Sequence, residues 1–169
     1  MLESFRITKY NPKNRNEKGH YLVDEWTSFS DVWKNVTFEE YITIENKYIE
    51  CVEKCMQIVN IKNLVLKKYE ENTSFYLINQ FWLDEKVYNS LHENINVCIN
   101  DIPTVIRAIL RGNCWWKLSW DKNFFIHFGW DYYMFIGFKS SKKLKQKVLN
   151  LNIEGLYIEE FRSPYLKSL

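Results

Sequence analysis

An eight-residue segment near the amino end, DEWTSFSD over residues 24–31, concentrates side chains that could bind a partner or do chemistry. It holds three carboxylates, three hydroxyls and an indole. Tryptophan often dominates interface energies, and paired carboxylates act as acid and base when burial separates their pKa values. The plainer alternative is a capping segment, in which these oxygens accept hydrogen bonds from helix N–H groups. We predict a partner-binding loop that uses Asp24, Glu25, Trp26, Ser28 and Asp31.

A second group lies in the aromatic run FFIHFGWDYY over residues 124–133. His127 and Asp131 could form a general base and the carboxylate that orients it. No motif assigns them a serine or cysteine nucleophile. A histidine within an aromatic strand is more often a hydrogen-bonded residue of the sheet, and we favour that interpretation.

The third group is EEFRSPY over residues 159–165. Successive side chains of a strand point to opposite faces, so one of Glu159 and Glu160 faces inward and needs a partner. Arg6 and Arg107 are the candidate partners. Two alternatives to an ion pair remain. The segment could belong to a protein interface, and we therefore add Glu159 and Tyr165 to the predicted partner-binding residues. Glu159 and Glu160 could also form a catalytic pair.

A run of lysines marks the segment from Lys139 to Lys147. Lysines could contact a phosphate backbone, but such a run more often forms the solvated face of a helix, and we favour that interpretation. Tryptophans could stack on bases, but their place within a strand-like run favours the core. The residues concerned are Lys139, Lys142, Lys143, Lys145 and Lys147, and Trp115, Trp116 and Trp120.

Composition narrows the classes of protein. The 169 residues are 46% hydrophobic and 26% charged, which excludes a disordered chain. Only five glycines are present and no phosphate-binding or metalloprotease motif occurs, which argues against nucleotide-dependent enzymes and against any cofactor. Residues 1–100 hold 12 Lys and Arg against 15 Asp and Glu, whereas residues 101–169 hold 11 against 6. The net charge of +2 is therefore the sum of an acidic amino-terminal part and a basic carboxyl-terminal part.

The four cysteines form no CxxC pair and have no histidine at ligand spacing, so we expect no metal site. Cys51 and Cys55 lie one helical turn apart on a segment whose periodicity makes them packing residues. Unpatterned thiols are typical of a reducing cytoplasm. The first residues lack the apolar run of a signal peptide, and no stretch is long enough to span a membrane.

The elements that must position these groups follow from periodicity. Thr37 and Glu40 form a capping box that opens a helix to about Val59, and its inner stripe is apolar or aromatic except for Glu45. The pattern of residues 114–138 predicts a three-strand meander. Residues 74–83 are ambiguous, with strand-like composition before a helix that begins at Asp84. Further strands are predicted at 4–10, 61–69 and 156–162, a strand or bend at 21–26, and further helices from Asp101 to Gly112 and over 140–151. We expect a single α+β domain over residues 1–169 with a mostly antiparallel sheet.

Three blocks that together span most of the chain carry a resemblance. The first covers residues 9–31, from KYNPK to DEWTSFSD; the second is HFGWDYYMFIG (127–137) and the third is GLYIEEFRSPY (155–165). These blocks resemble those of a group of small bacterial cytoplasmic proteins without an assigned activity. In size and general sequence character, the group is similar to the immunity proteins of contact-dependent and polymorphic toxin systems. The resemblance implies a non-catalytic cytoplasmic protein that neutralises a toxin domain by binding it. The alternatives are a small enzyme using His127 with Asp131 or Glu159 with Glu160, and a nucleic-acid-binding protein using the Lys139–Lys147 helix.

Overall fold

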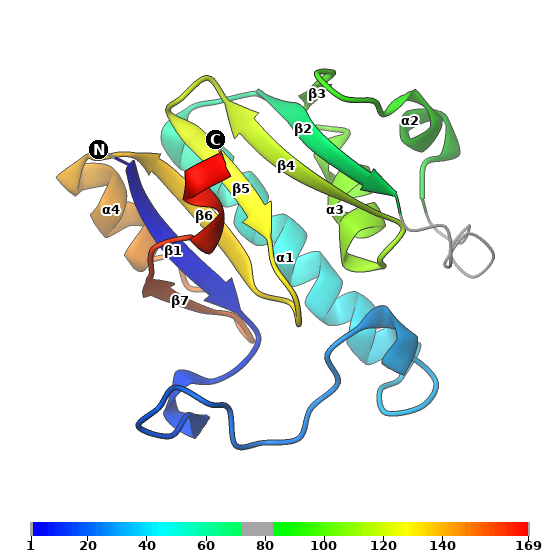
Figure 1. Cartoon of the computed structure of the whole chain (residues 1–169), viewed down its shortest axis with the longest axis vertical. Helices are drawn as coiled ribbons and strands as arrows, with labels where there is room; N and C mark the ends of the chain where they lie inside the picture. The colour runs from blue at the N-terminus through cyan, green and yellow to red at the C-terminus, as the bar shows by residue number, and fades with distance from the viewer. Residues whose placement is uncertain (1, 72–82, 169) are drawn as a thin grey trace.

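A seven-stranded antiparallel sheet forms the centre of the molecule, with the strand order β3-β2-β4-β5-β6-β1-β7 (Figure 1). The computed structural model describes residues 2–71 and 83–168. The strands are β1 (Leu2–Thr8), β2 (Asn63–Glu71), β3 (Asn96–Cys98), β4 (Cys114–Trp120), β5 (Phe124–Phe128), β6 (Met134–Lys139) and β7 (Tyr157–Glu160). The α-helices are α1 (Phe38–Val59), α2 (Glu85–Ser90), α3 (Ile102–Leu110) and α4 (Lys142–Leu149). This arrangement confirms the predicted α+β fold with its antiparallel sheet.

The capping box sets the start of the longest helix, α1. The Thr37 hydroxyl accepts a hydrogen bond from the Glu40 amide at 3.2 Å, and the Glu40 carboxylate accepts one from the Thr37 amide at 3.0 Å. The helix ends at Val59, where Asn60 adopts a left-handed φ of 61°. The predicted boundaries are therefore confirmed, because two reciprocal bonds satisfy the first N–H groups and a left-handed residue stops the helix.

The predicted meander is confirmed as β4, β5 and β6. Its two faces differ, as the alternation of side chains requires. Phe124, Ile126 and Phe128 join the main core with α1, α3 and α4, which cover one face in Figure 1. On the other face Phe125 and His127 stack at 4.4 Å between ring centroids. The carboxyl-terminal segment, which ends in the 3₁₀ turn η4 (Pro164–Ser168), lies over this face.

Several local predictions differ from the structure. At 21–26 the strand alternative is wrong and the bend alternative is confirmed, because Tyr21 forms an isolated bridge with Arg15 and the chain bends at Val23. The short strand β3 was not predicted, because three mostly polar residues give no periodic signal. The helix predicted from Asp84 has this residue as its N-cap and is short, spanning Glu85–Ser90. Apart from Leu83, the ambiguous 74–83 segment lies outside the described residues. No described helix combines the length and the apolar character needed to cross a membrane.

Candidate functional site

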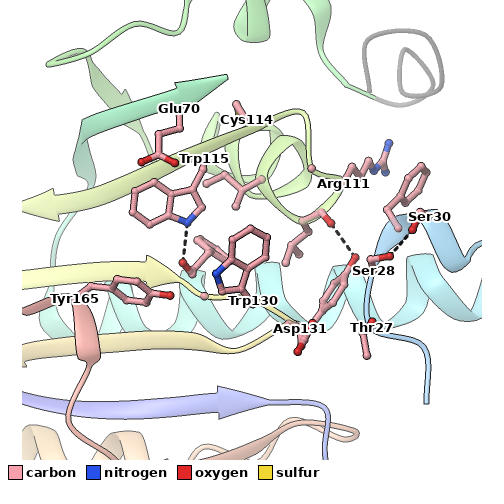
Figure 2. A pocket seen from close by; sticks show the side chains of 17 residues that line it. Thr27, Ser28, Ser30, Glu70, Arg111, Cys114, Trp115, Trp130, Asp131 and Tyr165 are labelled. Carbon is pink, nitrogen blue, oxygen red and sulfur yellow. Dashed lines mark hydrogen bonds between the residues drawn. The ribbon is translucent and has the colours of Figure 1, made fainter. Parts of the chain in front are cut away.

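A cleft of about 640 Å³ opens at one end of the sheet (Figure 2). One wall is formed by residues 27–30, which include the first two residues of the 3₁₀ turn η2 (Phe29–Asp31). The end of α3 contributes residues 109–112. Glu70 of β2, residues 114 and 115 of β4, residues 128–132 at the end of β5 and the turn after it, and Tyr165 of the carboxyl-terminal turn complete the lining. Segments far apart in the sequence therefore meet at this cleft.

The β5–β6 turn beside the cleft has an unusual backbone. The Tyr133 amide donates to the Trp130 carbonyl at 3.1 Å, and Asp131 and Tyr132 have φ values of 54° and 60°. Two left-handed central residues define a type I′ hairpin turn, a conformation that costs energy for a tyrosine. Two hydrogen bonds hold Tyr132 in place: the Tyr48 hydroxyl donates to its carbonyl at 2.5 Å, and its own hydroxyl donates to the Leu110 carbonyl at 2.8 Å. The turn is thus fixed to both α1 and α3.

The turn places Trp130 in solvent, with 87% of its surface exposed. Across the cleft, the Trp115 indole donates to the Phe128 carbonyl at 2.7 Å, which fixes the orientation of its ring. Tyr165 packs beside Trp115, with ring centroids 6.0 Å apart. Figure 2 shows the Trp130 and Trp115 indoles near the middle of the cleft and Tyr165 beyond them.

A buried ion pair supports the α3 side of the cleft. Glu45 of α1 and Arg111, which lines the cleft, are 0% and 1% exposed and share two hydrogen bonds of 2.7 Å. The Tyr41 hydroxyl donates to Glu45 at 3.1 Å, and the Tyr132 hydroxyl lies 3.1 Å from that of Tyr41. Glu45 is the polar exception on the otherwise apolar stripe of α1. That exception was the only sequence signal for this network.

Most of the predicted loop at residues 24–31 is engaged within the molecule. Trp26 packs against Tyr132 at 5.0 Å between ring centroids, and Lys9 lies 4.2 Å above its ring. Glu25 accepts hydrogen bonds from the Lys9 ammonium at 2.9 Å and the Tyr21 hydroxyl at 2.5 Å. Burial alone would raise the pKa of Glu25, but these two bonds outweigh it and lower the pKa.

The other members of the loop divide between capping and the cleft. Asp31 accepts hydrogen bonds from the amides of Thr27 at 2.8 Å and Ser28 at 3.1 Å, so the capping interpretation is confirmed for this carboxylate. Ser28 lies in the cleft lining with its hydroxyl 2.6 Å from that of Ser30. Asp24 is exposed.

The predicted carboxyl-terminal site residues are also divided. Glu159 pairs with Arg6 at 3.0 Å and Arg15 at 2.7 Å, which confirms Arg6 as a partner and adds one that was not predicted. Glu160 faces the other way and pairs with Lys145 at 2.6 Å. Tyr165 lines the cleft. Arg107, the other candidate partner, pairs instead with Glu45 at 3.3 Å.

His127 is fully buried, and its Nδ1 lies 3.2 Å from the Ser163 hydroxyl. Burial, followed by the charges of Lys117 and Lys68, lowers the pKa of His127 to about 3. Asp131 lies exposed on the hairpin turn. No described hydrogen bond joins Asp131 to His127. The histidine is therefore a neutral, hydrogen-bonded residue of the sheet.

Of the lysine segment, Lys139 ends strand β6 and the residues from Lys142 onward form α4, in which Lys142, Lys143 and Lys147 are exposed and Val148 is buried. Of the three tryptophans in the 114–120 run, Trp116 is buried in the core, as predicted, whereas Trp115 lines the cleft and Trp120 is partly exposed. The four cysteines lie within the described residues and form no disulfide, and Cys51 and Cys55 are buried in packing positions as predicted. Within residues 2–71 and 83–168, no group of histidine, cysteine, aspartate and glutamate side chains could hold a metal ion.

Of the seven predicted partner-binding residues, the structure brings Ser28 and Tyr165 together at the cleft. The predicted partner-binding residues did not include Trp115 and Trp130, which line the cleft, and Asp131 was considered only as a partner of His127. Comparisons with protein-family models, with curated proteins and with solved structures found no match for this chain.

Proposed function

We propose that the chain is a non-catalytic binding protein of the toxin-immunity type, that it acts in the cytoplasm, and that a toxin domain docks over the cleft. The observation that carries the proposal is Trp130, a large aromatic side chain 87% exposed on a turn fixed to two helices. A rigid exposed indole is the kind of residue that anchors protein interfaces. Because the turn is already ordered, binding loses little conformational entropy.

The surroundings of Trp130 also favour a protein partner. The cleft is lined by aromatic and aliphatic side chains, and it has polar groups at its rim, as in the buried core and polar border of an interface. A stable interface covers roughly 800 Å² on each partner. Exposed carboxylates near the cleft, including Glu70 and Asp131, would favour association with a basic partner.

The catalytic alternatives receive less support from the geometry. A general base must reach the proton that it removes. His127 is fully buried and hydrogen-bonded, Glu159 is bound by two arginines, and Glu160 is paired with Lys145. These groups are engaged in structural contacts of the fold, which is the arrangement expected of a binding protein.

Co-expression with a toxin tests the proposal. The probe is the product of the gene immediately upstream of the gene for this chain, which the proposal takes to carry the toxin domain, induced in a bacterial host with or without the chain. We expect the toxin domain alone to arrest growth, the chain to restore it, and the two proteins to co-elute as a stable complex. Continued arrest in the presence of folded chain, or protection without any complex, would contradict the proposal.

A further inference from the structure

Aromatic faces dominate the cleft. Phe29, Trp115, Phe128, Trp130, Tyr132 and Tyr165 all line it. The polar edges of two of these rings are already occupied, because the Trp115 indole donates to the Phe128 carbonyl and the Tyr132 hydroxyl donates to the Leu110 carbonyl. What these two rings offer to a ligand is therefore their apolar, electron-rich faces.

The charged groups of the cleft give it an acidic character. Glu70 and Asp131 are exposed and lie on opposite rims in Figure 2. Arg111 is the single cation among the described residues that line the cleft, and it forms a bidentate contact with Glu45, a carboxylate that it shares with Arg107. A cleft with aromatic faces and two exposed carboxylates complements a positive charge.

The chain already places its own cations over aromatic rings. Lys117 lies 5.7 Å from the Trp115 ring and 5.8 Å from the Tyr165 ring, and Arg6 lies 4.1 Å from the Phe161 ring. Lys117 is 4% exposed and is not among the described lining residues. Its charge would oppose a second cation at these rings, and the carboxylates of Glu70 and Asp131 offset that repulsion.

We propose that the cleft receives a cationic side chain of the protein partner, an arginine or a lysine, between Trp115, Trp130 and Tyr165, with Glu70 and Asp131 as counter-ions. This inference rests on the proposed function and specifies the chemistry of the docked surface. Arginine fits better than lysine, because its planar guanidinium stacks on aromatic rings and can pair with a carboxylate at the same time.

The test uses N-acetyl-arginine-N-methylamide as the probe and the indole N–H signals of the full chain in an NMR titration. Its neutral, nearly isosteric control is N-acetyl-citrulline-N-methylamide. We expect saturable shifts of the Trp115 and Trp130 indole signals with the arginine probe and at least tenfold weaker binding of the citrulline probe. The double variant Asp131→Asn and Glu70→Gln should weaken binding of the arginine probe about tenfold. Asparagine suits the left-handed backbone at position 131, so the turn should persist.

Asp24→Asn, which removes an exposed carboxylate outside the cleft lining, is the matched control and should leave binding unchanged. Equal binding of the two probes, the absence of binding, or full affinity in the double variant would overturn the inference. Tighter binding of tetramethylammonium than of the arginine probe would assign the cleft to small cations and overturn it too. If growth protection requires Trp130 but the arginine probe does not bind, this inference is wrong and the proposed function stands. If the arginine probe binds but the chain gives no growth protection, the proposed function is contradicted and the cation-binding cleft is not.

Discussion

Replacement of Glu45 by glutamine should lower the free energy of unfolding by about 3–5 kcal/mol. Arg111 is 1% exposed and forms two 2.7 Å hydrogen bonds to this carboxylate. Without the negative charge, the guanidinium would remain buried and uncompensated, which is far more costly than the loss of an exposed ion pair. Urea denaturation followed by far-ultraviolet circular dichroism measures the change.

The matched control is Glu50→Gln on the same helix. Glu50 pairs with Lys54 at 2.7 Å and Lys47 at 3.7 Å, but all three side chains are about one-third exposed. Exposed pairs contribute up to about 1 kcal/mol, so this variant should remain close to the wild type. Equal losses of unfolding free energy in the two variants would show that burial does not determine how much the Glu45–Arg111 pair stabilises the fold.

Acid should destabilise the fold through His127, before most of the carboxylates titrate. The pKa of His127 is lowered to about 3 by burial and then by Lys117 and Lys68, whereas an unfolded histidine titrates near pH 6.5. The unfolded chain therefore binds more protons between these values. The stabilising contribution is complete above pH 6.5 and decreases as the pH falls, by about 2 kcal/mol between pH 6.5 and 4.5.

A His127→Gln variant separates this effect from other titrations, since glutamine keeps an amide that can bond to Ser163 but has no charge to gain. Its stability should be nearly constant between pH 6.5 and 4.5. The lowered pKa values of Glu25 and Glu159 cause losses of stability only below about pH 4.5, with the same sign. An unchanged slope in the variant would mean that His127 does not titrate as a buried group.

The features that were predicted correctly from the sequence depend on residues close together in the chain. The reciprocal bonds of Thr37 and Glu40 act within four residues, so the start of α1 could be read directly. The meander was visible because its strands have strand-like periodicity separated by short turns. Glu45 broke the apolar stripe of α1 and required a buried partner, but the partner lies 66 residues away and no local pattern identifies Arg111.

The cleft depends on long-range contacts, which explains why the sequence placed the partner site mainly in the 24–31 loop. Nothing local shows that the aromatic face of Trp26 is covered by Tyr132 and Lys9, or that Glu25 holds Lys9. The β5–β6 turn has no Asn-Gly or Asp-Gly pair, the usual signal of a type I′ turn. Its left-handed tyrosine is stabilised by Tyr48 and Leu110, and so the exposure of Trp130 could not be foreseen.

The most direct measurement of the binding surface is the affinity of the Trp130→Ala variant for the purified toxin domain, determined by titration calorimetry. Trp33→Ala is the matched control, because Trp33 is 80% exposed but does not appear in the described cleft lining. If Trp130 anchors the partner, its removal should weaken binding at least 30-fold, equivalent to about 2 kcal/mol, with little change in Tm, while Trp33→Ala binds nearly as tightly as the wild type. Wild-type affinity in a folded Trp130→Ala variant would contradict the assignment of the cleft as the partner-binding surface.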